Sequence, residues 1–120
     1  MANVVAIIPA YNEEKALADV IGKTLEHVDE VIVVNDGSSD KTAEVAIEAG
    51  ARVISHSVNL GKGEALKSGF NAVGDDSIII TIDGDGQHNP SEIPDLIRRI
   101  IEDGADLVNG SRYLTTTSVR

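Results

Sequence analysis

The stretch from Ser77 to His88 reads SIIITIDGDGQH, in which the apolar run Ile78–Ile82 ends directly in Asp83-Gly84-Asp85-Gly86-Gln87-His88. A short apolar run that is followed by Gly and Asp indicates a buried strand ending at the protein surface. Carboxylate and carboxamide oxygens at alternate positions suit a hard divalent cation, and the glycines allow a bulky anion to approach the backbone. The stretch therefore predicts a metal-assisted reaction of a phosphate or diphosphate.

Three other interpretations of this stretch compete with metal-assisted chemistry. An EF-hand calcium loop beginning at Asp83 is excluded, because its sixth position is His88 rather than Gly and its twelfth is Pro94 rather than Glu. A phosphatase of the haloacid dehalogenase type would need a downstream lysine, and no lysine follows Lys67. The third alternative is a polar turn that only ends the strand, since Asp and Gly are common turn residues.

The composition restricts the size and the partners of the protein. The chain has 120 residues, of which 42% are hydrophobic, and 20 acidic against 10 basic residues give a formal charge of −10. This length suits one domain with a real core. The negative charge repels nucleic-acid backbones and anionic membrane surfaces, so we expect no nucleic-acid partner. An acidic protein that binds a diphosphate must neutralise it locally, which supports a bound cation.

Residue content also bears on the cellular compartment. Cysteine is absent, which excludes disulfides and thiolate chemistry and is compatible with a reducing cytoplasm. No apolar run approaches the roughly 18 residues that cross a bilayer, and no basic segment or cleavage site precedes the first apolar run. We therefore expect a soluble, cytoplasmic chain, and the sequence leaves open a site at the cytoplasmic face of a membrane for a full-length protein.

Strand-length apolar runs alternate with helical patterns along the chain. The expected strands are residues 4–8, 30–34, 52–55, 77–82 and 107–109, and the expected helices are residues 13–27, 40–49, 63–73 and one that opens at 89–92. This alternation, with strands that are apolar on both faces, predicts an α/β fold with an open, mainly parallel sheet and helices on both faces. In such sheets ligands bind beyond the carboxyl ends of the strands. Polar clusters follow the first four strands at that edge: Pro9–Glu14, Asn35–Asp40, Asn59–Gly63 and the cluster beginning at Asp83.

Several common nucleotide-binding motifs are missing from the chain. No Gly-x-Gly-x-x-Gly follows the first strand, and Gly61-Lys62-Gly63 lacks the spacing and the Ser or Thr of a P-loop. Pro9-Ala10-Tyr11-Asn12 stands where a sugar nucleotidyltransferase has a Gly-rich, Arg-containing loop. The sequence therefore supports neither a dinucleotide oxidoreductase, nor a P-loop ATPase, nor a sugar nucleotidyltransferase.

Three segments, in this order, resemble the donor-site motifs of the inverting glycosyltransferases of family 2, which have the GT-A fold. The segments are Pro9–Glu13, Val33–Asp40 and the Asp-x-Asp motif Asp83-Gly84-Asp85. Within the family, the dolichyl- or polyprenyl-phosphate mannosyl- and glucosyltransferases are the most similar, through Asn59–Gly63, Asp85–His88 and Gly110–Tyr113. The resemblance covers only the N-terminal, donor-binding half of a family member. It implies one nucleotide-sugar-binding domain over residues 1–120, truncated on the C-terminal side.

The resemblance assigns one group of residues to the nucleoside. These are Pro9, Ala10, Tyr11, Glu13, Val34 and Asp36. Tyr11 would offer an apolar face, and Glu13 would accept hydrogen bonds from the base or ribose. Asp36, with Val34 beneath it, would hold the base. The alternatives are a rim-packing role for Tyr11 and a turn or capping role for Asp36.

A second group is assigned to the diphosphate, the sugar and the metal. The predicted substrate-binding residues here are Lys62, Asp83, Gly84, Asp85 and Arg112. Asp85 and Gln87 are the predicted ligands of Mg²⁺ or Mn²⁺, and Asp83 and Asp85 are the predicted catalytic residues. Asp83, Asp85 and Gln87 share one parity, so they point the same way if the extended backbone continues past the strand. Lys62 and Arg112 would contact phosphates, the alternative being ordinary solvated cations.

The implied reaction moves a hexose from a GDP- or UDP-sugar to an acceptor with inversion. The metal and Arg112 would stabilise the departing nucleoside diphosphate while the acceptor attacks from the opposite face. A polyprenyl phosphate acceptor is already anionic and needs no general base. The alternative is a nucleotide-sugar binding module without catalysis. The sequence leaves the base, the sugar, the acceptor and the oligomeric state open.

Overall fold

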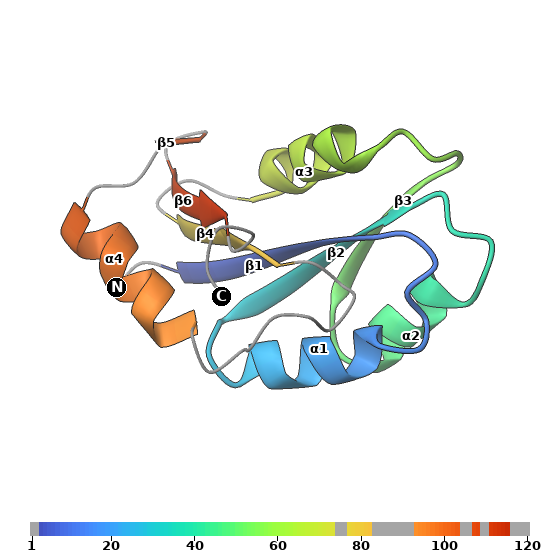
Figure 1. The fold of residues 1–120 in the computed structure, drawn as a ribbon, viewed down its shortest axis with the longest axis horizontal. Helices are drawn as coiled ribbons and strands as arrows, with labels where there is room; N and C mark the ends of the chain where they lie inside the picture. Colours follow the sequence, from blue (N-terminus) through green and yellow to red (C-terminus); the bar gives the residue numbers. More distant parts are fainter. Residues whose placement is uncertain (1–2, 74–76, 83–92, 104–106, 109–110, 116–120) are drawn as a thin grey trace.

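The computed structural model describes residues 3–73, 77–82, 93–103, 107–108 and 111–115. These residues form a six-stranded sheet with the strand order β3-β2-β1-β4-β6-β5 (Figure 1). The strands are β1 (Asn3–Ala10), β2 (Glu30–Asp36), β3 (Arg52–His56), β4 (Ser77–Thr81), β5 (Leu107–Val108) and β6 (Ser111–Thr115). The helices are α1 (Leu17–Leu25), α2 (Thr42–Glu48), α3 (Lys62–Asn71) and α4 (Ile93–Asp103). Among the helices in these ranges, none combines the length and the hydropathy that a membrane-spanning segment requires.

The sheet is parallel except at one edge. β1 pairs in parallel with β2 and β4, β2 with β3, and β4 with β6, whereas β5 is antiparallel to β6. Val5–Ile8 of β1 and Val31–Val34 of β2 are fully buried, as expected for central strands that are covered on both faces. The predicted α/β class and the mainly parallel sheet are therefore confirmed.

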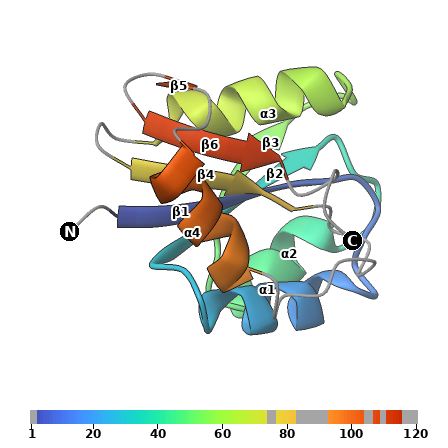
Figure 2. The same cartoon turned by 60° about the vertical axis from the view of Figure 1, so that its left-hand side comes forward.

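Helices α1, α2 and α4 cover one face of the sheet, and α3 covers the other (Figure 2). Because successive strand residues point to opposite faces, Ala6 and Ile8 pack in the core beneath α1, α2 and α4. Val5 and Ile7 pack in the second core with Ala65 of α3. The residues of β1 thus contribute to both cores.

Most observed elements lie within about two residues of their expected bounds, and the differences are larger at two places. The expected helix at 13–27 is regular only over Leu17–Leu25, and it is preceded by turns in which the Ala16 and Leu17 N–H groups both donate to the Glu13 carbonyl. The expected last strand, 107–109, is two residues long and pairs with β6, which the sequence analysis missed. Ser111–Thr115 is largely polar, so it lacks the apolar signal of a buried strand. It pairs with β4 through backbone hydrogen bonds, which leave no pattern in the sequence.

The second helix was expected to end at residue 49, and it ends at Glu48, with Ala49 as its C-cap and Gly50 as the next residue. The φ of Gly50, 101°, is left-handed, a conformation that glycine adopts without steric cost. The Gly50 N–H donates to the Ile47 carbonyl at 3.1 Å, and the Ala51 N–H donates to the Ala46 carbonyl at 3.1 Å. This is the Schellman arrangement, which satisfies the last carbonyls of α2.

Helix α3 approaches β1 closely at Gly69. A Cβ atom at Gly69 would lie 2.5 Å from Cγ2 and 3.1 Å from Cδ1 of Ile7. Ile7 is fully buried, so its side chain cannot move without disturbing the close-packed core around it. The missing side chain of Gly69 therefore sets the distance between the helix and the sheet.

We predict that Gly69→Ala lowers the free energy of unfolding by about 1–3 kcal/mol, because overpacking outweighs the better helix propensity of Ala. Gly63→Ala is the matched control in the same helix, since nothing lies within 4 Å of an added Cβ there. This control should be neutral or stabilising by up to about 1 kcal/mol. Urea unfolding measures both variants, and a Gly69→Ala variant as stable as the parent would contradict the role of Gly69.

Candidate functional site

Three described loops leave the carboxyl ends of neighbouring strands. The first loop (residues 11–16) follows β1, the second loop (residues 37–41) follows β2 and the third loop (residues 57–61) follows β3. The strand register places Ala10 opposite Asn35, and Asp36 opposite His56. The three loops therefore begin side by side at one edge of the sheet (Figure 1), where open parallel sheets bind ligands.

Asn12 joins the first loop to the second. Its φ of 53° is left-handed, which Asn tolerates better than most residues. The Asn12 N–H donates to Ser38 Oγ at 2.9 Å, and Asn12 Oδ1 accepts from the Ser39 N–H at 2.9 Å. These reciprocal bonds hold the unusual backbone conformation of Asn12 in place.

Side chains of each of these two segments also accept hydrogen bonds from the backbone of the other. The Glu13 N–H donates to Thr42 Oγ1 at 3.0 Å, and the Lys41 N–H donates to Glu14 Oε2 at 3.0 Å. Asp40 accepts from the hydroxyl and the N–H of Thr42, and the hydroxyl bond is the main reason that the pKa of the Asp40 carboxyl is lowered. The first and second loops thus form one connected unit.

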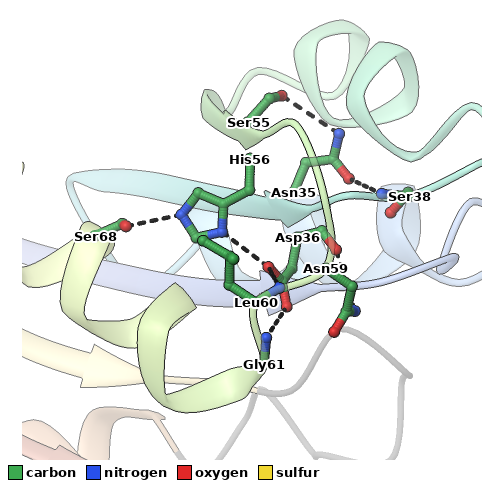
Figure 3. Close-up of polar contacts among 9 residues, drawn as sticks. All are labelled: Asn35, Asp36, Ser38, Ser55, His56, Asn59, Leu60, Gly61 and Ser68. Carbon is green, nitrogen blue, oxygen red and sulfur yellow. Dashed lines mark hydrogen bonds and ion pairs between the residues drawn. The ribbon is translucent and has the colours of Figure 1, made fainter.

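The buried carboxylate of Asp36 holds the third loop (Figure 3). Its Oδ2 accepts from the Gly61 N–H at 2.8 Å, and its Oδ1 accepts from the Leu60 N–H at 2.9 Å. Oδ1 also lies 2.8 Å from Nδ1 of His56. Burial on its own raises the pKa of Asp36, but the bonds from Leu60, His56 and Gly61 outweigh it, so the pKa is lowered. Asp36 is therefore ionised at neutral pH.

His56 and Ser68 are residues of this cluster that the sequence analysis missed. His56 ends β3 directly opposite Asp36, and its Nε2 lies 2.8 Å from Oγ of Ser68 in α3 (Figure 3). The available signal was a histidine next to the end of the expected third strand. That signal identifies no partner, because the register between β2 and β3 cannot be read from the sequence.

Backbone packing at Gly37 also joins the second and third loops. A Cβ at Gly37 would lie 2.4 Å from the backbone N of Asn59 and 2.4 Å from the carbonyl C of Val58. Gly37 also has a left-handed φ of 75°. The Asn59 amide donates to the Asp36 carbonyl oxygen at 3.2 Å. Only glycine at this position allows the third loop to lie so close.

Seven of the predicted site residues lie at or directly below this edge: Pro9, Ala10, Tyr11, Glu13, Val34, Asp36 and Lys62. Tyr11 is 49% exposed, so part of its ring can contact a ligand. Val34 is fully buried two residues before Asp36 and faces the α3 side of the sheet. Lys62 is exposed and begins α3 directly after Gly61.

The predicted metal cluster follows β4. The Ile82 N–H donates to the Ile7 carbonyl at 2.9 Å, so pairing with β1 continues to the residue before Asp83. Asp83, Gly84, Asp85 and Gln87 themselves lie outside the described residues. Among the residues that the structure does describe, no group of three His, Cys, Asp or Glu could hold a metal. The oxygen donors after β4 fit Mg²⁺ or Mn²⁺ by their chemistry.

Arg112 lies past β5 and within a further strand, β6. Its backbone pairs with Ile78, the second residue of β4, and so lies toward the amino end of that strand. The side chain of Arg112 lies outside the described part of the structure, so its phosphate contact stays a prediction.

We predict that Asp36→Asn lowers the free energy of unfolding by about 1–3 kcal/mol near neutral pH, because an amide replaces an oxygen that accepts buried N–H groups. Asp19→Asn is the control: its ion pair with Lys23 is exposed, so we expect a loss below about 1 kcal/mol. Chemical denaturation measures both variants. Equal losses in the two would contradict the anchoring role of Asp36.

The stability difference between the parent and Asp36→Asn should also depend on pH. The folded protein holds Asp36 at a lower pKa than the unfolded chain, so its stabilisation is complete above the unfolded pKa near about 3.9. It is lost as the pH falls through the lower pKa of the folded state. The stability difference between the parent and Asp36→Asn should therefore stay constant above about pH 5 and narrow as the pH falls below that value.

Comparison with known proteins identifies related sequences. A family model described as glycosyl transferase family 2 matches residues 5–120. The chain is 42% identical to protein RfbJ of Shigella flexneri, over 92% of this chain and 85% of that protein. It is 36% identical to uncharacterized protein MJ1222 of Methanocaldococcus jannaschii, over 95% of this chain and 48% of that protein.

A further relative is the undecaprenyl-phosphate 4-deoxy-4-formamido-L-arabinose transferase of Photorhabdus laumondii, 40% identical over 88% of this chain and 36% of that enzyme. Among solved structures, glucosyl-3-phosphoglycerate synthase of Mycobacterium tuberculosis in complex with Mn²⁺, UDP and glucosyl-3-phosphoglycerate has a TM-score of 0.73. Its sequence identity is 34%, over 84% of this chain and 40% of that one. The chain thus spans less than half the length of both enzymes.

Proposed function

Because this chain belongs to glycosyl transferase family 2, we propose that it binds a nucleoside diphosphate sugar at the carboxyl edge of its sheet and transfers the sugar to an acceptor. The observation that carries the proposal is the union of the first, second and third loops at that edge through Asn12, Asp36 and Gly37. A donor site of this kind needs loops that are held in place before the ligand arrives.

The nucleoside would bind against the first and second loops. The exposed ring of Tyr11 offers a flat apolar surface for the base, and the Glu13 carboxylate is an acceptor for ribose or base. Asp36 Oδ2 accepts one hydrogen bond among the described residues, so it retains capacity for an N–H of a base. We propose UDP-sugars as the first donors to test, since the mycobacterial neighbour was crystallised with UDP and UDP-glucose. GDP-sugars are the second.

The diphosphate would bind between α3 and the residues that follow β4. Lys62 would contact a phosphate oxygen from the start of α3. Arg112 is a weaker candidate, because its backbone pairs with Ile78 toward the amino end of β4. Asp85 and Gln87 would hold Mg²⁺ or Mn²⁺, ions that accompany UDP in the neighbouring structures. Such a cation offsets the charge that develops on a departing diphosphate. Asp83 would contact the ribose or the sugar, with Gly84 allowing the sugar to come close.

We propose a polyprenyl phosphate as the acceptor, because curated relatives are undecaprenyl-phosphate sugar transferases. One phosphate oxygen of the acceptor would form a bond to the anomeric carbon. The bond from that carbon to the donor diphosphate breaks, and its electron pair leaves with the nucleoside diphosphate. Attack from the face opposite the leaving group inverts the anomeric centre. The attacking oxygen is already anionic, so no residue of the chain has to remove a proton.

The test measures nucleotide binding and nucleoside diphosphate release in the presence of Mn²⁺. UDP-glucose and GDP-mannose serve as donors, with and without undecaprenyl phosphate. We expect Asp85→Ala to weaken Mn²⁺-dependent nucleotide binding more than about tenfold, through loss of a metal ligand. The control Asp19→Ala removes an exposed carboxylate of α1 and should bind like the parent.

Each outcome of this test has a distinct meaning. Release that depends on the lipid phosphate supports the proposed transfer. Binding of the nucleotide-sugar without release would favour a donor-binding module. An Asp85→Ala variant that binds as tightly as the parent would make the metal assignment wrong, and a parent that binds no nucleotide would contradict the whole proposal.

A further inference from the structure

We propose that His56 is a positioning residue, which fixes the third loop, and with it Lys62, at the edge where the donor diphosphate binds. The inference rests on the proposed function for the identity of the ligand. The positioning itself rests on contacts between described residues alone. It gives a role to a histidine that lies outside the three donor-site motifs.

The hydrogen bond between His56 and Asp36 has a defined direction. The ionised carboxylate of Asp36 can only accept, so Nδ1 of His56 must carry the hydrogen of their 2.8 Å contact. In the neutral ring Nε2 is then an acceptor, and the Ser68 hydroxyl donates to it at 2.8 Å. The imidazole therefore bridges α3 and the end of β2 in one orientation (Figure 3).

These contacts connect Asp36, the third loop, α3 and His56 in a closed circuit. Asp36 accepts from the backbone of Leu60 and Gly61, and the next residue begins α3. Six residues further along the same helix, Ser68 bonds back to His56. The start of α3 is thus tied to Asp36 directly through the third loop and indirectly through the imidazole.

Polar contacts hold the third loop where apolar packing does little. Val58 is 60% and Leu60 is 52% exposed, so these side chains bury little apolar surface. The Asp36 and His56 side chains, in contrast, are only 5% and 12% exposed. Hydrogen bonds are stronger in such a buried environment, and losing one partner there is costly. The orientation of the Asp36 carboxylate therefore decides where Leu60 and Gly61 lie.

Two substitutions at His56 distinguish a role in holding Asp36 from a role in filling space. In His56→Asn the side-chain amide nitrogen stands where Nδ1 stood, so it can still donate to Asp36. In His56→Gln the amide reaches toward Ser68, as Nε2 did, and the donor to Asp36 is lost. Both variants replace the imidazole ring with a side-chain amide, so the two substituted side chains have the same polar group.

Amide hydrogen exchange on the nucleotide-free protein tests the loop directly. We expect the Leu60 and Gly61 amides to exchange about tenfold faster in His56→Gln and within about threefold of the parent in His56→Asn. The amides of Ile7 and Ile8 in β1 serve as the reference for global stability. Unchanged exchange in His56→Gln, or equal acceleration of both loop and reference amides, would overturn the proposal.

Titration with UDP and with GDP in the presence of Mn²⁺ tests the consequence for the donor site. We expect His56→Gln to weaken nucleotide affinity about tenfold and His56→Asn to keep it near that of the parent. Faster loop exchange with unchanged affinity would overturn the link to the donor. A parent that binds neither nucleotide would contradict the proposed function, while the exchange measurement still decides whether His56 holds the loop.

Discussion

The arrangement of the carboxyl edge depends on one buried carboxylate, that of Asp36. It accepts hydrogen bonds from His56 and from two backbone N–H groups of the third loop, and it lies at the end of a strand that is buried from Val31 onward. Removing a carboxylate from water is costly, and these donors repay that cost only when the loop is in place. The ionised state of Asp36 and the position of the third loop are therefore two aspects of one equilibrium.

The contacts between the first, second and third loops likewise provide hydrogen-bond partners for polar groups at the carboxyl edge. Asn12 exchanges hydrogen bonds with the second loop, and Gly37 allows the third loop to pack against its backbone. Ends of parallel strands leave many backbone groups without ladder partners, and these side chains supply the missing ones. The result is a connected frame of described loops that is held in place by the protein's own contacts.

This frame suggests how a strongly acidic protein of glycosyl transferase family 2 presents the proposed site for an anionic donor. Part of its negative charge is directed inward, since Asp36 and Asp40 bond to the protein's own donors. Lys62 begins α3 directly after Gly61, which bonds to Asp36, and N–H groups at the start of a helix favour an anion. The pattern fits a division of roles in which carboxylates within the loops maintain shape and those after β4 are left for a cation.

The sequence by itself determined the α/β class, the parallel central strands and the family, because buried strands and donor-site motifs are local patterns. It also predicted that the polar clusters after β1, β2 and β3 would share one edge. It did not indicate β6, whose residues carry little apolar signal, or the partners of Asp36. Those partners depend on the register of β2 with β3 and on the packing of α3, which bring His56 and Ser68 into contact across the fold. Only the tertiary structure decides such contacts, because they join residues whose spacing along the chain carries no periodic signal.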